Sequence, residues 1–162
     1  MSDFLHRYGG QIGRLTFEHV WLTASAMLFA CAIGLPLGVL LTRRRALAKP
    51  VLAVANILQT IPSLALFGLL LPVPFLGERA ARLAIVALTA YALLPILRNT
   101  YDGIGSVDAA LIDVANALGM TGWQRLRKVE LPMAAGVILG GMRTATVICV
   151  GVATIAAAIG AG

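Results

Sequence analysis

Apolar stretches long enough to cross a membrane alternate with short charged clusters along this chain. A helix needs about 20 mostly apolar residues to cross a hydrocarbon core roughly 30 Å thick. Two stretches, residues 20–42 and 50–77, contain no charged residue. Residues 80–97 form a shorter third stretch, and residues 131–162 form a fourth that only Arg143 interrupts. The pattern predicts an all-α, polytopic membrane helix bundle with about four spans.

Local breaks in these stretches indicate how the helices are shaped. Proline lacks the backbone donor that a helix interior needs. Pro62, followed by Pro72 and Pro74, therefore predicts a second span that is kinked and ends near Leu71. Residues 4–20 mix charged, aromatic and apolar side chains, and we expect them to lie along the membrane interface. The fourth stretch has room for a turn or re-entrant segment after its helix. The whole chain, 1–162, is expected to form a single transmembrane domain.

Composition and charge place the chain in lipid and predict its orientation. Apolar residues make up 59% of it and charged residues 12%, about half the usual charged fraction. The net charge of +6 is spread over short clusters, so no nucleic acid partner is expected. Loops 43–49 and 98–130 carry four Lys or Arg each, against two in each of the other exposed segments. Because such loops stay in the cytoplasm, both are predicted to be cytoplasmic in a multi-pass protein of the cell (inner) membrane, with the N-terminus outside.

No residue pattern predicts catalysis, a cofactor or a metal. Cys31 and Cys149 lie within apolar runs, where lone thiols usually behave as small apolar side chains. The sequence has no Gly-x-x-x-x-Gly-Lys-Ser/Thr phosphate loop. The chain is therefore not expected to be an enzyme, and any ATP hydrolysis must come from another subunit.

Residues 104–132 form the longest polar segment and predict two short helices. Ser106 or Asp108 can cap the first helix, and Gly119 stands where a left-handed stop is needed. Thr121 and Gln124 have the spacing of a capping box, which would open the second helix. The spacing of the apolar positions places an exposed stripe on one face of the first helix, at Leu111, Val114, Ala115 and Leu118. Such a stripe needs a partner, unless it packs on its own bundle or lies on lipid headgroups.

This segment resembles the "EAA loop" of ABC importer permeases. That pattern is Glu-Ala-Ala, three residues, Gly, nine residues, Ile, one residue and Leu-Pro. Here Asp113-Val-Ala stands at the start, Gly119 follows after three residues, and Val129-Glu-Leu-Pro132 follows after nine more. The resemblance implies that the loop docks on a cytoplasmic ATP-binding subunit. The residues expected at that contact are Asp113, Val114, Ala115, Asn116, Gly119 and Trp123.

A narrower resemblance covers most of the chain. Residues 58–68 (LQTIPSLALFG), 91–101 (YALLPILRNTY) and 155–162 (IAAAIGAG) are similar to permeases of osmoprotectant importers. This implies a solute pathway for glycine betaine, choline or related quaternary ammonium compounds. It also implies an extracytoplasmic solute-binding protein and a second permease subunit, the same or related. Members of this family usually continue beyond Gly-Ala-Gly, so the chain is expected to be either C-terminally incomplete or abbreviated.

Polar residues beside Pro62 mark candidate positions for the solute pathway or a gate. They are Gln59, Thr60, Pro62 and Ser63, which would be tolerated at membrane depth only when they face protein or water. The alternative is that they join helices by hydrogen bonds. Tyr91 has the same two interpretations, as a π-face for a quaternary ammonium group or as a core tyrosine.

Arg143 and two glycine pairs have structural interpretations. A buried arginine in a membrane is costly unless it is paired or hydrated. We interpret Arg143 as a structural anchor, with Glu130 or Asp113 as its partner if the last span begins after Leu131. The pairs Gly34/Gly38 and Gly136/Gly140 have the spacing that allows close helix approach. Pro36 lies within the first pair and is expected to weaken its helix.

Other functions stay open at this point. The solute of an ABC importer permease could instead be an amino acid or another small molecule. An ion-gradient-driven carrier would be expected to hold titratable groups at mid-membrane in several spans, which this chain lacks. A membrane scaffold that recruits a cytoplasmic partner is a third alternative, and co-purification of an ATPase would distinguish it.

Overall fold

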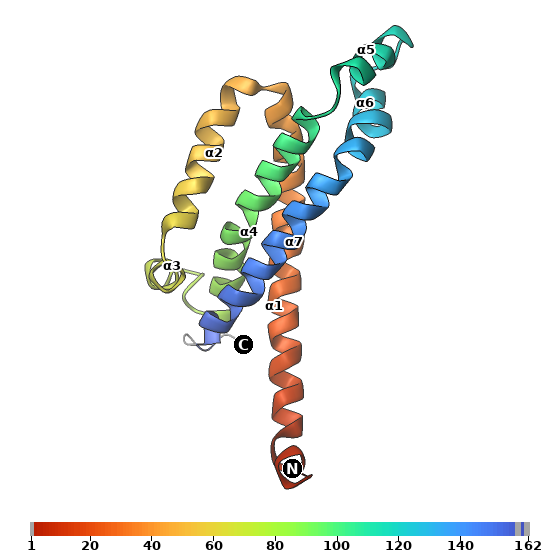
Figure 1. Ribbon diagram of the computed structural model, residues 1–162. Coiled ribbons are helices and arrows are strands. Elements are labelled where there is room, and N and C mark those ends of the chain that lie inside the picture. The colour runs from red at the N-terminus through yellow and green to blue at the C-terminus, as the bar shows by residue number, and fades with distance from the viewer. Residues whose placement is uncertain (1, 158–159, 161–162) are drawn as a thin grey trace.

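The computed structural model describes residues 2–157 and 160, and all regular structure in this part of the chain is helical (Figure 1). The helices are α1 (Ser2–Arg43), α2 (Arg45–Thr60), α3 (Ser63–Leu70), α4 (Ala80–Gly105), α5 (Ala109–Ala117), α6 (Gly122–Arg125), the π turn η1 (Leu126–Glu130) and α7 (Leu131–Ala156). Three helical segments are long and apolar enough to cross a membrane, and α2 with α3 makes up to a fourth crossing. The predicted all-α membrane bundle of about four spans is confirmed.

Helix α4 occupies the centre of the bundle, where α1 and α7 pack along it and α2 lies beside it (Figure 1). Half of the sixteen buried residues in the largest core cluster are alanine. Small side chains let membrane helices approach closely, because lipid supplies no hydrophobic force to bring them together. The tight fit between small residues therefore holds this core together.

Glycines create the closest helix contacts, only partly where the sequence predicts them. A β-carbon added at Gly38 would lie 2.6 Å from the Thr100 Cβ, and one at Gly34 would lie 2.9 Å from the Ile96 Cγ2. The predicted pair in α1 therefore packs against α4. The prediction for Gly136 and Gly140 is not met within the described chain, since added β-carbons there would meet nothing within 4 Å. Gly141, one position later, makes the contact between α7 and α4.

Helix α1 is longer and more regular than the sequence suggests. Residues 4–20 do not turn away along an interface but continue the same helix into the first span, through Pro36, to Arg43 (Figure 1). No proline precedes Pro36, so nothing in this stretch removes a helical hydrogen bond. Pro36 is exposed, and the helix passes through it without ending.

The second span is broken and not merely kinked. Helices α2 and α3 meet at 98° across Ile61 and Pro62. Ile61 is extended, with φ −72° and ψ 125°, because a following proline disfavours the helical conformation of the residue before it. Helix α3 ends at Leu70, close to the predicted end at Leu71.

Boundaries near the polar loop differ from the prediction. Helix α4 extends to Gly105, and α7 follows α6 and η1 without a break, so Gly122–Ala156 forms one continuous helical rod. The region between the long helices is therefore shorter than 98–130. The expected turn after the last span lies largely outside the described residues.

Candidate functional site

The loop between α4 and α7 has the local structure that its sequence predicts. Asp108 caps α5, since its Oδ1 accepts a hydrogen bond from the Ala110 amide at 2.9 Å. Gly119 has φ +72°, the left-handed conformation that ends a helix. Thr121 and Gln124 form a reciprocal capping box at the start of α6. The predicted helix–turn–helix is confirmed.

An apolar surface faces outward on this loop. The exposed fractions are 39% for Leu111, 57% for Val114, 70% for Leu118 and 68% for Trp123. We call these four residues the docking surface, after the docking role that the resemblance implies for this loop and that stays a prediction here. Ala115, which the spacing predicts in the exposed stripe, is 2% exposed, so the prediction that it is exposed is wrong. It faces inward because α5 packs on α6 and η1. Asp113, Asn116 and Gly119 are exposed beside the surface.

A buried carboxylate lies behind the docking surface, and sequence reasoning missed its role. Glu130 is 2% exposed and accepts hydrogen bonds from two arginines. Arg43, the last residue of α1, holds both carboxylate oxygens, with Nη1 3.2 Å from Oε1 and Nη2 bonded to Oε2. Arg125 donates from Nε to Oε1 at 2.8 Å and from Nη1 to the Asn116 Oδ1 at 2.8 Å. Side chains of α1, η1, α6 and α5 are thereby connected in one series of hydrogen bonds.

The π turn η1 aligns Arg125 and Glu130, two members of this series of hydrogen-bonded side chains. In an α-helix, residues five apart point about 140° away from each other. In η1 the Leu131 amide bonds to the Leu126 carbonyl, five residues back. This wider turn brings Arg125 and Glu130, also five apart, onto one side. Such turns inside helices frequently occur at functional sites.

The predicted partnership of Arg143 with Glu130 or Asp113 is wrong. Glu130 is held by Arg43 and Arg125, and within the described residues Arg143 forms no ion pair. Because the helix is continuous from Gly122, Arg143 lies thirteen residues beyond Glu130, about 20 Å along the axis. Its side chain is exposed on α7, so its role as an anchor has no supporting contact within the described chain.

The broken second span is fastened to α4 by two hydrogen bonds. The Gln59 Nε2 donates to the Tyr91 carbonyl at 2.8 Å, and the Tyr91 hydroxyl donates to the Ile61 carbonyl. The break frees the Ile61 carbonyl from helical bonding, and a buried polar group needs a partner. The predicted candidates Gln59, Thr60, Pro62, Ser63 and Tyr91 therefore meet, and they line a hollow of about 350 Å³ with Ile61, Ile148 and Val152.

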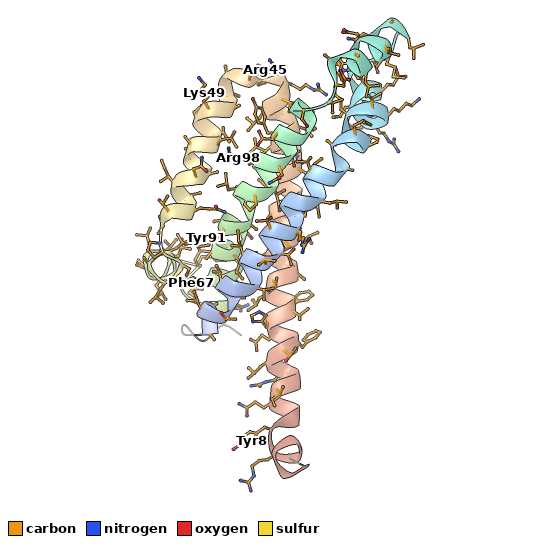
Figure 2. All side chains as sticks on the ribbon, viewed as in Figure 1. Tyr8, Arg45, Lys49, Phe67, Tyr91 and Arg98 are labelled. Carbon is orange, nitrogen blue, oxygen red and sulfur yellow. The ribbon has the colours of Figure 1, made fainter. Side chains whose placement is uncertain are left out.

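Tyr91 itself is placed as a core residue. It is 7% exposed and lies among the helices on the side of α3 (Figure 2). In this arrangement its ring is covered, and its hydroxyl donates to the Ile61 carbonyl at the break in the second span. Of the polar residues around Pro62, Gln59 thus joins two helices, whereas the exposed Thr60 donates to the Ile57 carbonyl within α2. Gln59 and Ser63 are half-buried at the edge of the hollow.

Tyr91→Phe is expected to loosen the break between α2 and α3. Losing this hydrogen bond costs about 1 kcal/mol, which corresponds to roughly a fivefold rise in local opening. The rate at which a thiol reagent labels a cysteine placed at Ser63, in a variant without Cys31 and Cys149, measures that opening. Tyr101→Phe is the control, because the Tyr101 hydroxyl makes no hydrogen bond within the described residues. Equal labelling rates in both variants would show that the Tyr91 hydroxyl does not hold the break.

Comparison with known proteins agrees with this architecture. Residues 34–162 match the family described as "Binding-protein-dependent transport system inner membrane component". The osmoprotectant import permease protein OsmW of Salmonella typhimurium (strain LT2) is 51% identical over 155 residues, which cover 94% of this chain and 72% of OsmW. The glycine betaine/carnitine/choline permease protein OpuCB of Bacillus subtilis (strain 168) is 42% identical over 162 residues, which cover 100% of this chain and 73% of OpuCB.

A solved structure has the same arrangement of helices. A chain of the inward-facing MetNI methionine ABC transporter superimposes with a TM-score of 0.83 and 29% identity, covering 96% of this chain and 77% of that one. The family match, the identity to OsmW and this likeness agree on one assignment. The chain belongs to the inner membrane components of binding-protein-dependent transport systems, the permeases of ABC importers.

Proposed function

We propose that this permease forms the pathway by which an ATP-driven importer takes up small quaternary ammonium osmoprotectants such as glycine betaine, choline and carnitine. The observation that carries the proposal is the 51% identity to an osmoprotectant import permease over nearly the whole chain. Several further relatives, 42–46% identical, are named as choline, carnitine or glycine betaine permeases. The methionine transporter shares the fold at lower identity, which makes an amino acid the second candidate.

Uptake by the assembled importer tests the solute class. The permease, produced with its own ATP-binding subunit and solute-binding protein in cells without other osmoprotectant uptake, is expected to accumulate radiolabelled glycine betaine, choline or carnitine. It is not expected to accumulate methionine. Uptake should stop when ATP is depleted while the ion gradient is held constant. Methionine uptake alone would overturn the solute class, and uptake without ATP would indicate an ion-driven carrier.

The docking surface is our candidate contact for the cytoplasmic ATP-binding subunit. Leu118 and Trp123 are about two-thirds exposed on a loop that projects beyond the bundle (Figure 1). Exposed apolar patches on a soluble face mark interaction sites, because water solvates them poorly. Asp113, Val114, Asn116 and Gly119 lie at the same contact, and Ala115 supports it from inside.

The arrangement of charges supports a cytoplasmic position for this loop. Arg45 and Lys49 lie at the same end of the molecule as α5 and α6, whereas Tyr8 lies at the opposite end (Figure 2). Because basic loops stay in the cytoplasm, we infer that the segments 43–49 and 98–130 face the cytoplasm and the N-terminus lies outside. The inner membrane is the location that family membership implies.

One labelling experiment tests both orientation and docking. A cysteine at Leu118, in a variant without Cys31 and Cys149, is expected to react with a membrane-impermeant thiol reagent only in inside-out vesicles. The bound ATP-binding subunit should protect it. A cysteine at Gln11 is the control and should react only from the other face. Labelling of Leu118→Cys from outside would overturn the orientation, and unchanged labelling with the subunit bound would overturn the docking contact.

A second permease subunit and an external solute-binding protein complete the proposed importer. The exposed Arg143 lies about 20 Å from Glu130, at a depth where lipid is a costly environment for arginine. We infer that this face of α7 is covered by the second permease or lines a wet pathway. Pathway candidates remain Gln59, Thr60, Pro62, Ser63 and Tyr91. Native mass measurement of the purified importer should show two permease subunits, either two copies of this chain or one copy with a related chain, and a single permease subunit would contradict this assembly.

A further inference from the structure

The segment between α4 and α7, residues 106–130, carries the docking surface, and we call it the docking loop. It has few ways to transmit a force to the membrane helices. Helix α5 packs chiefly on α6 and η1, and α5 and α6 project beyond the bundle in Figure 1. Leu126 of η1 packs in one apolar cluster with Ile104 of α4 and Val39 of α1. The rod Gly122–Ala156 joins the loop covalently to α7. Contact with the end of α1 depends on side chains, and the ion pair from Arg43 to Glu130 spans 87 residues of sequence.

Glu130 is held at this junction by two arginines. Its side chain is 3% exposed, while those of Arg43 and Arg125 are 36% and 23% exposed. A two-pronged contact between a guanidinium and a carboxylate fixes distance and orientation together. The second arginine, Arg125, donates one hydrogen bond to the same carboxylate and another to Asn116 on α5, and so connects α5 to Glu130. Displacement of α5 therefore reaches the carboxylate through Arg125 and the end of α1 through Arg43.

We propose that Glu130 is a positioning residue. Its two ion pairs, with Arg43 and Arg125, form a clamp that makes the docking loop, the end of α1 and the start of α7 move as one body. This inference rests on the proposed docking of an ATP-binding subunit and adds the route by which its motion enters the membrane. The clamp joins two spans to one loop, so each ATP-driven displacement acts on α1 and α7 together. Without the carboxylate, the loop keeps its covalent join to α7 and the apolar packing around Leu126, but it loses the polar link from Arg125 through Glu130 to Arg43.

The π turn is suited to this role. It has the wide turn that aligns Arg125 with Glu130, and it lies where the loop joins α7. A regular α-helix would direct the two side chains about 140° apart and leave the carboxylate to Arg43 alone. The turn thus allows one carboxylate to serve both arginines.

The test measures how much solute moves for each ATP hydrolysed. Importers assembled with their ATP-binding subunit and binding protein are reconstituted in vesicles, and radiolabelled glycine betaine uptake and phosphate release are followed together. Glu130→Gln keeps the shape of the side chain and removes its charge. We expect normal co-purification of the ATP-binding subunit, continued ATP hydrolysis and about a tenfold fall in solute per ATP, within the usual range of coupling between sites. Arg43→Gln should do the same, and Arg43→Lys, which keeps the charge but cannot hold both carboxylate oxygens in the two-pronged geometry, should recover only part of the loss.

The matched control breaks a different ion pair at the same end of the molecule. Arg98→Gln removes the exposed pair of Arg98 and Asp102, which are 3.5 Å apart on α4, and should leave solute per ATP unchanged. A normal ratio in Glu130→Gln and Arg43→Gln would overturn the proposal. So would parallel loss of subunit binding, ATP hydrolysis and uptake in both variants, which would make Glu130 a residue that only holds the fold. Failure of the unaltered permease to bind any ATP-binding subunit would instead overturn the proposed function.

Discussion

Replacing Gly119 with valine is expected to abolish solute uptake while the protein still inserts in the membrane. Gly119 has φ +72° at the turn between α5 and α6. Residues with a β-carbon pay about 1–2 kcal/mol for this conformation, and a β-branched side chain is a genuine outlier there. The turn would adopt another conformation and redirect α5, together with Val114 and Leu118 of the docking surface. ATP-dependent uptake and the amount of permease in the membrane are the two measurements.

The surroundings of Gly119 make this a test of backbone conformation. A β-carbon at this position would meet nothing within 4 Å among the described residues, so the β-carbon itself is opposed by the backbone conformation and not by a neighbouring atom. Gly119→Asn is the control, because asparagine enters the left-handed region far more readily. We expect it to keep most of the uptake. Normal uptake by the valine variant would contradict the role of the turn, and loss in both variants would show that the partner subunit needs the bare glycine surface.

Gly141→Ala is expected to destabilise the permease, although the same change usually strengthens a helix. A β-carbon there would lie 2.6 Å from the Asn99 Cβ and 2.7 Å from the Pro95 carbonyl oxygen. The backbone oxygen cannot move aside as a side chain could, so α7 must shift away from α4. Overpacking of this kind costs about 1–3 kcal/mol. Thermal unfolding of the purified permease in detergent should occur at a lower temperature.

Gly136→Ala is the matched control on the same helix and should have the opposite effect. Its added β-carbon would meet nothing within 4 Å, and alanine is about 1 kcal/mol better than glycine inside a helix. We expect unchanged or raised thermal stability for this variant. If both alanine variants unfold at the same temperature as the unaltered protein, the close approach of α7 to α4 at Gly141 does not limit stability.

Short-range chemistry made much of the docking loop predictable. Asp108, Gly119 and the pair Thr121–Gln124 act on backbone groups within three residues of themselves, so their roles follow from spacing alone. Pro62 likewise acts on its neighbour Ile61. The severity of that break, 98°, was not predictable, because it depends on what α3 packs against.

Long-range partners were not predictable from spacing. Tyr91 is separated by 30 residues from the Ile61 carbonyl that it serves. Charge alone makes Glu130 a candidate partner for Arg143, but the continuous rod places the two residues about 20 Å apart. Ala115 has the spacing of the exposed stripe, yet packing of α5 on α6 and η1 buries it.

By itself, the sequence determined that this chain is a helical membrane protein with a loop of two short, capped helices separated by a glycine turn. Apolar run length, charge placement and capping act within one helix or one loop, and their physical effects need no knowledge of the rest of the fold. Only the tertiary structure decided which arginines hold Glu130 and which glycine of α7 meets α4. These depend on how α1, α4 and α7 are placed against one another, and that placement is set by many small packing contacts acting together, which no single position along the chain records.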